Sequence, residues 1–185
     1  MQDAFWNAVD TDAPQTVQQE LARHYYKIRD GLGGAQSPAK YGAFPQDPYS
    51  HTPSWGGAHQ PGLTGQVKED ILCRWGELGI RITDGILRIN PALLRRAEFC
   101  RSPEKFSWYD THGNLKSLQL NVGALAFTYC QIPFVFHLSD EPLLKTRGEH
   151  TEERPELALS LEESAALFGR TGKLTRVDAY LTPSF

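Results

Sequence analysis

The chain has 185 residues, of which 40% are hydrophobic and 22% are charged, and its formal net charge is −3. These fractions are ordinary for a soluble globular protein, and the length allows one large domain or two small ones. Because the balance is acidic and no basic run occurs, the sequence argues against a nucleic-acid partner. No apolar run is long enough to cross a bilayer, so we expect no membrane partner. The first ten residues lack the basic and apolar segments of a signal peptide, and the compartment is left open.

The three cysteines, Cys73, Cys100 and Cys130, are far apart in the sequence and odd in number. This pattern favours free, buried thiols over a disulfide framework or a metal site, and a single disulfide stays an open alternative. The sequence contains no phosphate-loop, nucleophile-elbow or dinucleotide-binding fingerprint. We therefore expect no cofactor.

The N-terminal part is predicted to be helical. A short helical turn is expected over 3–9, and a helix over roughly 14–30 follows a start signal at Asp12 and Pro14. The apolar residues of this second helix recur at helical spacing: Val17, Leu21, Tyr25 and Ile28. The helix over 14–30 and the helix expected to follow it each carry an apolar stripe. Two such helices cannot bury both stripes against each other alone, which indicates a missing packing partner.

The stretch from Tyr41 to Gly79 organises the rest of the chain. Its first half is predicted to be part of a long ordered loop over 31–63, because prolines and glycines prevent regular structure. The loop mixes large aromatic side chains with short polar ones: Tyr41, Phe44, Tyr49, Trp55, Asp47, Ser50, His51, Thr52, His59 and Gln60. Such a loop suits a saccharide, which has an apolar ring face and a fringe of hydroxyls. An ordered loop that only covers a core is the open alternative.

The second half of this stretch predicts a helix that starts with an N-cap at Thr64 and ends before a C′ glycine at Gly79. The expected buried stripe consists of apolar residues at three- and four-residue steps: Val67, Ile71, Leu72, Trp75 and Leu78. The loop would deliver its polar groups to the helix start, where free N–H groups favour anions or hydroxyl oxygens.

After Gly79 the hydrophobic period becomes that of strands. Asp84-Gly85 is the strongest short hairpin signal and is flanked by isoleucine-rich runs. Further strands are predicted over 105–109, 115–120, 124–131, 132–138 and 174–181. The polar, acidic segment 140–156 is expected to be exposed, and a capping box at Ser160 predicts a short helix over 160–168. Several short strands at this spacing suggest an antiparallel sandwich.

The run from Trp75 to Pro91, WGELGIRITDGILRINP, resembles the end of a cellobiose-phosphorylase-type protein. In that family the last helix of an (α/α)6 barrel passes into a β-sandwich through a hairpin of this kind. The segments DPYSHTP and QPGLTGQVKE also resemble the C-terminal part of large bacterial proteins with six-hairpin glycosidase architecture. The resemblance covers roughly Tyr41 to Pro91, with a weaker echo over 123–138.

The resemblance implies an α+β fold. A helical hairpin within residues 1–79, similar to the end of an (α/α)6-type barrel, would be followed by an antiparallel, β-sandwich-like part over 80–185. It also implies a carbohydrate-active protein that binds an oligosaccharide or other glycan. A complete barrel needs about twelve helices, which cannot fit in this chain at ordinary helix lengths. We therefore expect a C-terminal fragment, a separately encoded end of a split protein or a remnant, with the missing N-terminal part of the barrel as a partner.

The resemblance also places candidate site residues. In the phosphorylases a Thr-Gly pair before the last helix helps to hold phosphate, and Thr64 and Gly65 match that pair, whereas the residues that follow depart from the family pattern. Glycoside cleavage usually needs two carboxyl groups. Asp47 and Glu69 are the candidate catalytic residues, with Asp70 as a further carboxylate near the helix start. Candidate saccharide contacts are Tyr49, His51, Trp55, His59, Gln60, Thr64, Gly65 and Gln66.

Each of these assignments has a structural alternative. Asp47 precedes a proline and could only shape a turn, and Glu69 in an early helical turn could only interact with the helix dipole. His51 and His59 match no standard metal-ligand spacing, so no metal is expected. The leading hypothesis is the C-terminal part of a glycoside hydrolase- or phosphorylase-like protein that is inactive alone. The alternatives are a non-catalytic carbohydrate-binding or protein-interaction module and a structural remnant.

Overall fold

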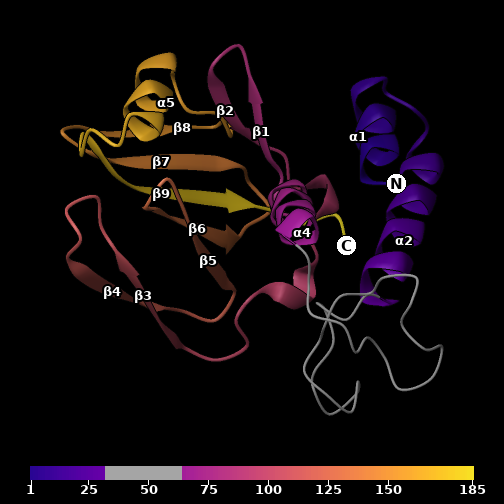
Figure 1. The fold of residues 1–185 in the computed structure, drawn as a ribbon, viewed down its shortest axis with the longest axis horizontal. Helices are drawn as coiled ribbons and strands as arrows, with labels where there is room; N and C mark the ends of the chain where they lie inside the picture. Colours follow the sequence, from indigo (N-terminus) through magenta and orange to yellow (C-terminus); the bar gives the residue numbers. More distant parts are fainter. Residues whose placement is uncertain (32–63) are drawn as a thin grey trace. The chain divides into compact units, whose positions relative to one another are not determined.

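The computed structural model describes the backbone of residues 1–31 and 64–185, and the side chains of 1–29 and 71–185. The chain divides into two compact units, Met1–Arg74 and Trp75–Phe185, each of which is described by itself (Figure 1). Helices and a sheet-rich C-terminal part together make an α+β fold, as predicted. None of the described helices combines the length and the apolar character that crossing a membrane requires.

The first unit is helical. It contains α1 (Gln2–Asp10), α2 (Gln15–Gly31) and most of α4 (Thr64–Glu77), so the helices predicted over 3–9 and 14–30 are confirmed. The helices α1 and α2 pack together, and five of their residues are buried: Phe5, Ala8, Ala22, Tyr25 and Tyr26. The Gln2 side-chain amide donates to the Cys73 carbonyl at 2.7 Å, which ties the start of α1 to α4.

Part of the apolar stripe of these helices is exposed to solvent. Val17 and Ile28 on α2 are 43% and 53% exposed, and Ile71 and Leu72 on α4 are 47% and 67% exposed. The prediction that Ile71 and Leu72 lie in a buried stripe is therefore wrong for the described chain. An amphipathic helix normally packs its apolar face against another element, so these helices bury only a part of what their sequences provide.

The end of α4 leads directly into a hairpin. Gly79 follows the helix with a φ of +73°, which confirms the predicted C′ glycine. The strands β1 (Ile80–Thr83) and β2 (Ile86–Ile89) pair antiparallel on either side of Asp84 and Gly85, both of which have positive φ. This is the two-residue turn that the Asp-Gly signal predicts. Pro91 then begins a short 3-10 turn, Pro91–Leu93, whose N-cap is Asn90.

A five-stranded sheet forms the centre of the second unit. Its strand order is β5-β6-β9-β7-β8, and β6 and β9 are its one parallel pair (Figure 1). The strands span Ala124–Tyr129 (β5), Ile132–Leu138 (β6), Leu143–Gly148 (β7), Thr151–Arg154 (β8) and Leu174–Leu181 (β9). The sheet is otherwise antiparallel, as predicted, and the parallel pair arises because α5 (Leu161–Phe168) and the connections around it precede β9.

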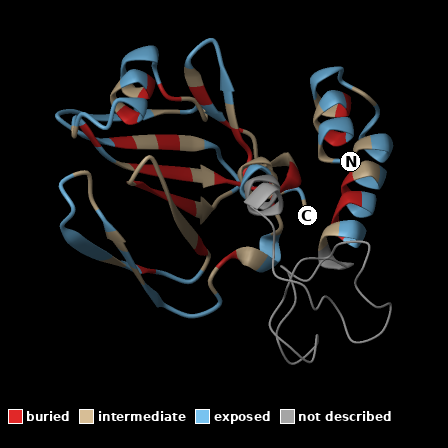
Figure 2. Ribbon diagram, in the orientation of Figure 1, coloured by how far each residue is buried: buried red, intermediate tan, exposed pale blue. Residues whose placement is uncertain are grey.

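One face of this sheet carries the main core. Phe134, Phe136 and Val177 are fully buried there, and Leu167 of α5 and Leu87 of β2 pack into the same cluster. Buried residues accordingly run along β6 and β9 and the inner side of α5 (Figure 2). Trp75 at the end of α4 closes the edge of this core with its ring edge-on to Tyr129, at 4.9 Å between centroids.

The opposite face is covered in part by a second hairpin. The strands β3 (Glu104–Tyr109) and β4 (Leu115–Leu120) pair antiparallel, close to the predicted bounds. Leu120 forms a small cluster with Ala124 and Val135 of the sheet, and Phe106 and Leu118 pack against it. The second unit therefore has a layered arrangement, with the sheet between α5 and β1–β2 on one side and β3–β4 on the other.

The segment 140–156 is largely exposed, as predicted, but the sequence did not predict the strands that it contains. It contains β7 and β8, and the β7 side chains of Leu144 and Thr146 are buried. Charged residues at alternate positions of these strands made the segment appear solvated, although the residues between them face the core. By contrast, the capping box at Ser160 and Glu163 is present as predicted.

The junction at Gly79 yields a stability prediction. A Cβ at this position would lie 1.8 Å from the Asn90 carbonyl oxygen, and the positive φ disfavours any L side chain. We expect Gly79→Ala to lower the free energy of unfolding by about 3 kcal/mol, combining backbone strain with overpacking. Gly113→Ala is a matched control, because Gly113 also has positive φ but its Cβ would meet no atom within 4 Å. That variant is expected to lose about 1 kcal/mol. If urea unfolding shows the same loss of unfolding free energy for Gly79→Ala and Gly113→Ala, the close approach of the Asn90 carbonyl to Gly79 is contradicted.

Candidate functional site

The site residues predicted from the sequence lie largely outside the described residues. Six of them fall within 32–63, which the structure does not describe: Asp47, Tyr49, His51, Trp55, His59 and Gln60. The other four, Thr64, Gly65, Gln66 and Glu69, belong to α4, of which only the backbone is described over this range. The helix begins at Thr64, so Thr64 and Gly65 occupy the first turn, where N–H groups have no acceptor within the helix. These assignments stay predictions.

Within the described residues, a polar cluster lies on the face of the five-stranded sheet opposite the main core. Successive side chains of a strand point to opposite faces, so Val177 and Ala179 of β9 face the core and Arg176, Asp178 and Tyr180 face the other way. Residues paired in register share a face. The parallel pair with β6 therefore adds His137. The antiparallel pair with β7 adds Lys145 and Arg147.

Asp178 is the centre of this polar cluster. Its side chain is 2% exposed and accepts hydrogen bonds at Oδ1 from His137 Nε2 at 2.9 Å and from an Arg176 terminal nitrogen at 2.5 Å. Its other oxygen, Oδ2, lies 3.4 Å from Arg147 Nε. A carboxylate is rarely buried to this extent without such partners, because desolvation disfavours its charged form.

The cationic neighbours keep Asp178 ionised. Burial raises the pKa of the Asp178 carboxyl, but the hydrogen bonds from His137 and Arg176, together with their charges, outweigh burial and hold the pKa below its ordinary value of 3.8. A carboxylate with a lowered pKa is a hydrogen-bond acceptor at neutral pH and a poor proton donor. Asp178 can therefore orient His137 and the arginines but cannot serve as a general acid.

The remaining members of the cluster surround this ionised carboxylate. The imidazole of His137 stacks on the Tyr180 ring at 4.6 Å between centroids, with 19° between the ring planes. Lys145 Nζ lies 5.6 Å from the Tyr180 centroid and pairs with Glu153 at 2.8 Å. A histidine held by a buried carboxylate is also part of Ser-His-Asp catalytic triads. Among the described residues, however, His137 makes no hydrogen bond with a hydroxyl or thiol, so the third member of such a triad is not present beside it.

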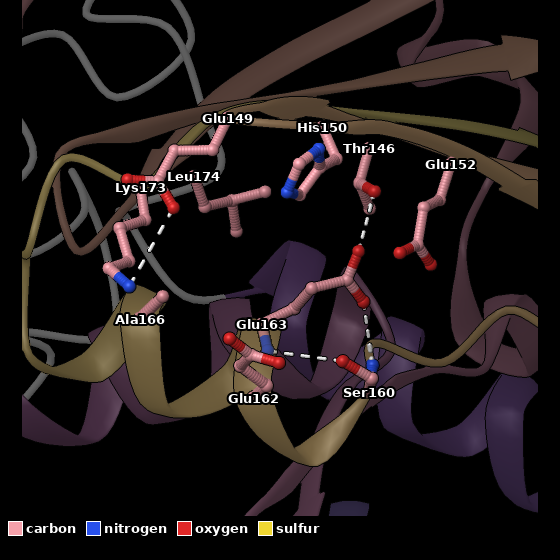
Figure 3. Close-up of a pocket in the computed structure, with 10 residues that line it drawn as sticks. All are labelled: Thr146, Glu149, His150, Glu152, Ser160, Glu162, Glu163, Ala166, Lys173 and Leu174. Carbon is pink, nitrogen blue, oxygen red and sulfur yellow. Dashed lines mark hydrogen bonds and ion pairs between the residues drawn. The ribbon is translucent and has the colours of Figure 1, made fainter.

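A small pocket lies on the other face of the sheet, between α5 and the β7–β8 hairpin (Figure 3). Its volume is about 90 Å³, and most of its lining is polar: Thr146, Glu149, His150, Glu152, Ser160, Glu162, Glu163, Ala166, Lys173 and Leu174. Figure 3 shows Glu163 reaching from α5 to Thr146 above it and to Ser160 beside it. Four of these lining residues are glutamates. Because glycosidases use a pair of carboxyl groups, this pocket is a candidate location for such a pair.

The bonds of Glu163 argue against such a pair in this pocket. This carboxylate accepts from Thr146 Oγ1 at 2.5 Å, from the Ser160 amide at 2.7 Å and from two terminal nitrogens of Arg154 at 2.6 and 2.9 Å. Burial raises the pKa of Glu163, but the hydrogen bonds from Arg154, Thr146 and Ser160 bring the pKa below its ordinary 4.5. The general acid of a glycosidase needs a raised pKa. Glu163 therefore caps α5 and fastens it to β7 and β8.

The described residues provide no metal site. They include no group of three or more His, Cys, Asp or Glu side chains placed to hold an ion. Cys73, Cys100 and Cys130 are free, as the sequence predicts, but they are only partly buried, whereas buried thiols were expected. The chain matches none of the known protein-family models, and a search of curated proteins returns no match either.

Sequence reasoning missed the cluster around Asp178, although one signal was available. Aspartate is depleted in strands, and Asp178 stands in the middle of an otherwise apolar and aromatic run, Val177 to Leu181. A buried charge in such a position requires partners. His137 is 41 residues away in the sequence, and no local pattern identifies it as the partner.

The Asp178 cluster predicts both a stability loss and its pH dependence. We expect Asp178→Asn to lower the free energy of unfolding at pH 7 by about 2 kcal/mol, since it removes the buried charge that accepts hydrogen bonds from His137 and Arg176. Because the folded-state pKa lies below the ordinary 3.8, the contribution of Asp178 is complete above that value and is lost as the pH falls through the folded-state pKa. The gap between wild type and variant should therefore narrow below about pH 4.

Urea unfolding from pH 7 to pH 2.5 measures this difference. Asp140→Asn, at an exposed aspartate two residues after β6, is the matched control and should stay within about 0.5 kcal/mol of wild type. A gap between wild type and Asp178→Asn that stays constant, or widens, in acid would show that Asp178 does not stabilise the fold as a carboxylate.

Proposed function

We propose that this chain is the C-terminal, saccharide-binding part of a carbohydrate-active protein similar to six-hairpin glycosidases. The observation that carries the proposal is the order of elements at the α4–β1 junction. A helix ends at a C′ glycine, passes into a tight Asp-Gly hairpin and continues through Pro91 into a sheet-rich unit. This is the same order of elements as in the family that the run from Trp75 to Pro91 resembles.

The helical unit supports a second part of the proposal, that other helices complete it. Val17 and Ile28 of α2, and Ile71 and Leu72 of α4, are exposed apolar residues at positions where a barrel helix would bury its stripe. Burying one such side chain is worth about 1.5–3 kcal/mol, so a partner that covers the four residues gains substantial binding free energy. We infer that helical hairpins similar to those of an (α/α)6 barrel are the natural partner of this surface.

The saccharide contacts in this proposal come from the loop and from the start of α4. Trp55 and Tyr49 supply aromatic faces, and His51, His59 and Gln60 supply hydrogen bonds. Asp47 and Glu69 are the proposed acid–base pair. Asp178 and Glu163 of the sheet unit have lowered pKa values and established structural partners, so neither provides a general acid. Catalysis in this proposal therefore requires the loop and the partner hairpins together.

A second candidate function is a carbohydrate-binding module without catalysis. It is favoured by the same observation about Glu163 and Asp178, because a binding module needs aromatic faces and hydrogen bonds but no group with a raised pKa. When the partner hairpins are supplied, the enzyme-fragment proposal predicts turnover of a saccharide, whereas the binding-module proposal predicts none. They share the prediction that Trp55 contributes to binding.

Binding by the purified chain tests the proposal. We expect isothermal titration with a panel of neutral oligosaccharides to detect binding that Trp55→Ala weakens at least about tenfold, because stacked aromatic rings carry much of the affinity for sugars. Tyr109→Ala is the matched control: Tyr109 is an aromatic residue that is 63% exposed on β3, and its loss should leave the affinity unchanged.

Two outcomes would contradict the proposal. The first is the absence of binding to any saccharide in the panel, and the second is equal weakening by Trp55→Ala and Tyr109→Ala. Hydrolysis or phosphorolysis by the chain alone, abolished by Glu69→Gln, would show that catalysis does not depend on partner hairpins.

A further inference from the structure

Two arginines face each other directly across neighbouring strands. The register of β7 and β9 pairs Arg147 with Arg176, and both side chains lie on the sheet face opposite the main core. Like charges directly opposite in an antiparallel pair destabilise the sheet. Asp178 balances part of this repulsion, but one carboxylate faces two guanidinium groups. Arrangements that break a local rule are expected at functional sites, so the remaining positive charge of the Arg147–Arg176 pair points to a ligand.

The carboxylate next to these arginines does not satisfy them. Asp178 receives one close hydrogen bond from Arg176, while Arg147 approaches its Oδ2 through Nε at 3.4 Å without forming a hydrogen bond. Arg176 Nε is buried and has no acceptor among the described residues. A guanidinium group has five N–H donors in a planar fork. Two such groups that share one buried carboxylate leave donors available for another oxyanion.

The surroundings of the pair are also cationic. Lys145 is the neighbour of Arg147 on the same face of β7, and His137 reaches Asp178 from β6. On this part of the sheet the permanent cations Arg147, Arg176 and Lys145 exceed the carboxylates Asp178 and Glu153, although the whole chain carries a net charge of −3. The excess of positive charge is therefore local.

The pair is also accessible to a ligand. The Arg147 side chain is 56% exposed and that of Arg176 is 28% exposed, while Asp178 beneath them is 2% exposed. Asp178 holds the Arg176 guanidinium by a hydrogen bond and attracts that of Arg147 across 3.4 Å, which reduces the conformational entropy that a ligand must overcome. On the same face, His137 of β6 and Tyr180 of β9 are paired in register, and their stacked rings lie beside Asp178.

We propose that Arg147 and Arg176 form a binding site for an oxyanion group, a carboxylate, sulfate or phosphate, with Asp178 as the residue that positions them. Arg147 binds the anion with the terminal nitrogens that Asp178 does not engage, in the bidentate geometry that guanidinium groups adopt with oxyanions. Arg176 adds positive charge from the facing strand. This proposal stands without the saccharide function. Where both hold, the ligand is an acidic saccharide.

An NMR titration of the full chain tests the site. Sodium sulfate, sodium phosphate and trigalacturonate are added at constant ionic strength, with cellotriose as the neutral saccharide. We expect saturable shifts of amides in 143–148 and 174–181 with each anion that binds. Arg147→Gln is expected to raise the dissociation constant about tenfold, and Arg147→Lys less, because lysine keeps the charge but loses the planar fork. Lys105→Gln, which removes one exposed charge from β3, is the matched control and should not change the dissociation constant.

The outcomes separate the possible sources of the anion. Tighter binding of trigalacturonate than of sulfate or phosphate supports the site and assigns it to an acidic saccharide, whereas saturable binding of the inorganic anions alone supports a site for a free anion. Shifts that stay linear to high concentration, or an equal effect of Arg147→Gln and Lys105→Gln, overturn the proposal. Cellotriose reports on neutral-saccharide binding independently, so its failure to bind bears on the proposed saccharide function and leaves the oxyanion site unaffected.

Discussion

The turn at Gly79 is the constraint on which the second unit depends. Its left-handed backbone ends α4 and starts β1, and its carbonyl accepts the Asn90 amide at 2.8 Å, which closes the far end of the β1–β2 hairpin. The hairpin is in turn bonded to the segment before α5, through Ile89 to Leu157 at 2.8 Å and Leu159 to Leu87 at 3.0 Å. The end of α4, the hairpin and the start of α5 are thereby fixed to one core, because each hydrogen bond joins segments that are distant in sequence.

The two faces of the five-stranded sheet then take different roles. The face that packs against α5 is apolar, so the hydrophobic effect holds it together. The opposite face contains an ionised Asp178 and several cations. A buried ion pair is weak evidence for stability, since desolvation costs about as much as the attraction returns. The facing pair Arg147 and Arg176 adds a further cost. We therefore attribute most of the stability of the unit to the apolar face, while the ion pairs of Asp178 keep its buried charge on the other face compensated.

The sequence could predict the elements whose signals are local. Asp84-Gly85 marks a hairpin and Ser160 with Glu163 marks a helix start, and both are present as expected. The strand β7 was missed because its surroundings are rich in charged residues and the buried Thr146 is itself polar, so the alternation with Lys145 and Arg147 did not appear as one of apolar and polar residues. The Asp178 cluster was missed for a different reason. It forms only when β6 and β9, separated by β7, β8 and α5, pair in parallel, and such non-local pairing leaves no pattern in a single sequence.

The sheet unit has one continuous buried core, whereas α2 and the described part of α4 leave apolar residues of their stripes exposed. Native-state hydrogen exchange of the purified chain measures this directly, because amides exchange at rates set by local or global opening. The account predicts that amides of β6 and β9 exchange only by global unfolding, and that those of α2 exchange at least about a hundredfold faster. Protection of α2 equal to that of β6 would show that the helices are already fully packed, and would contradict the account.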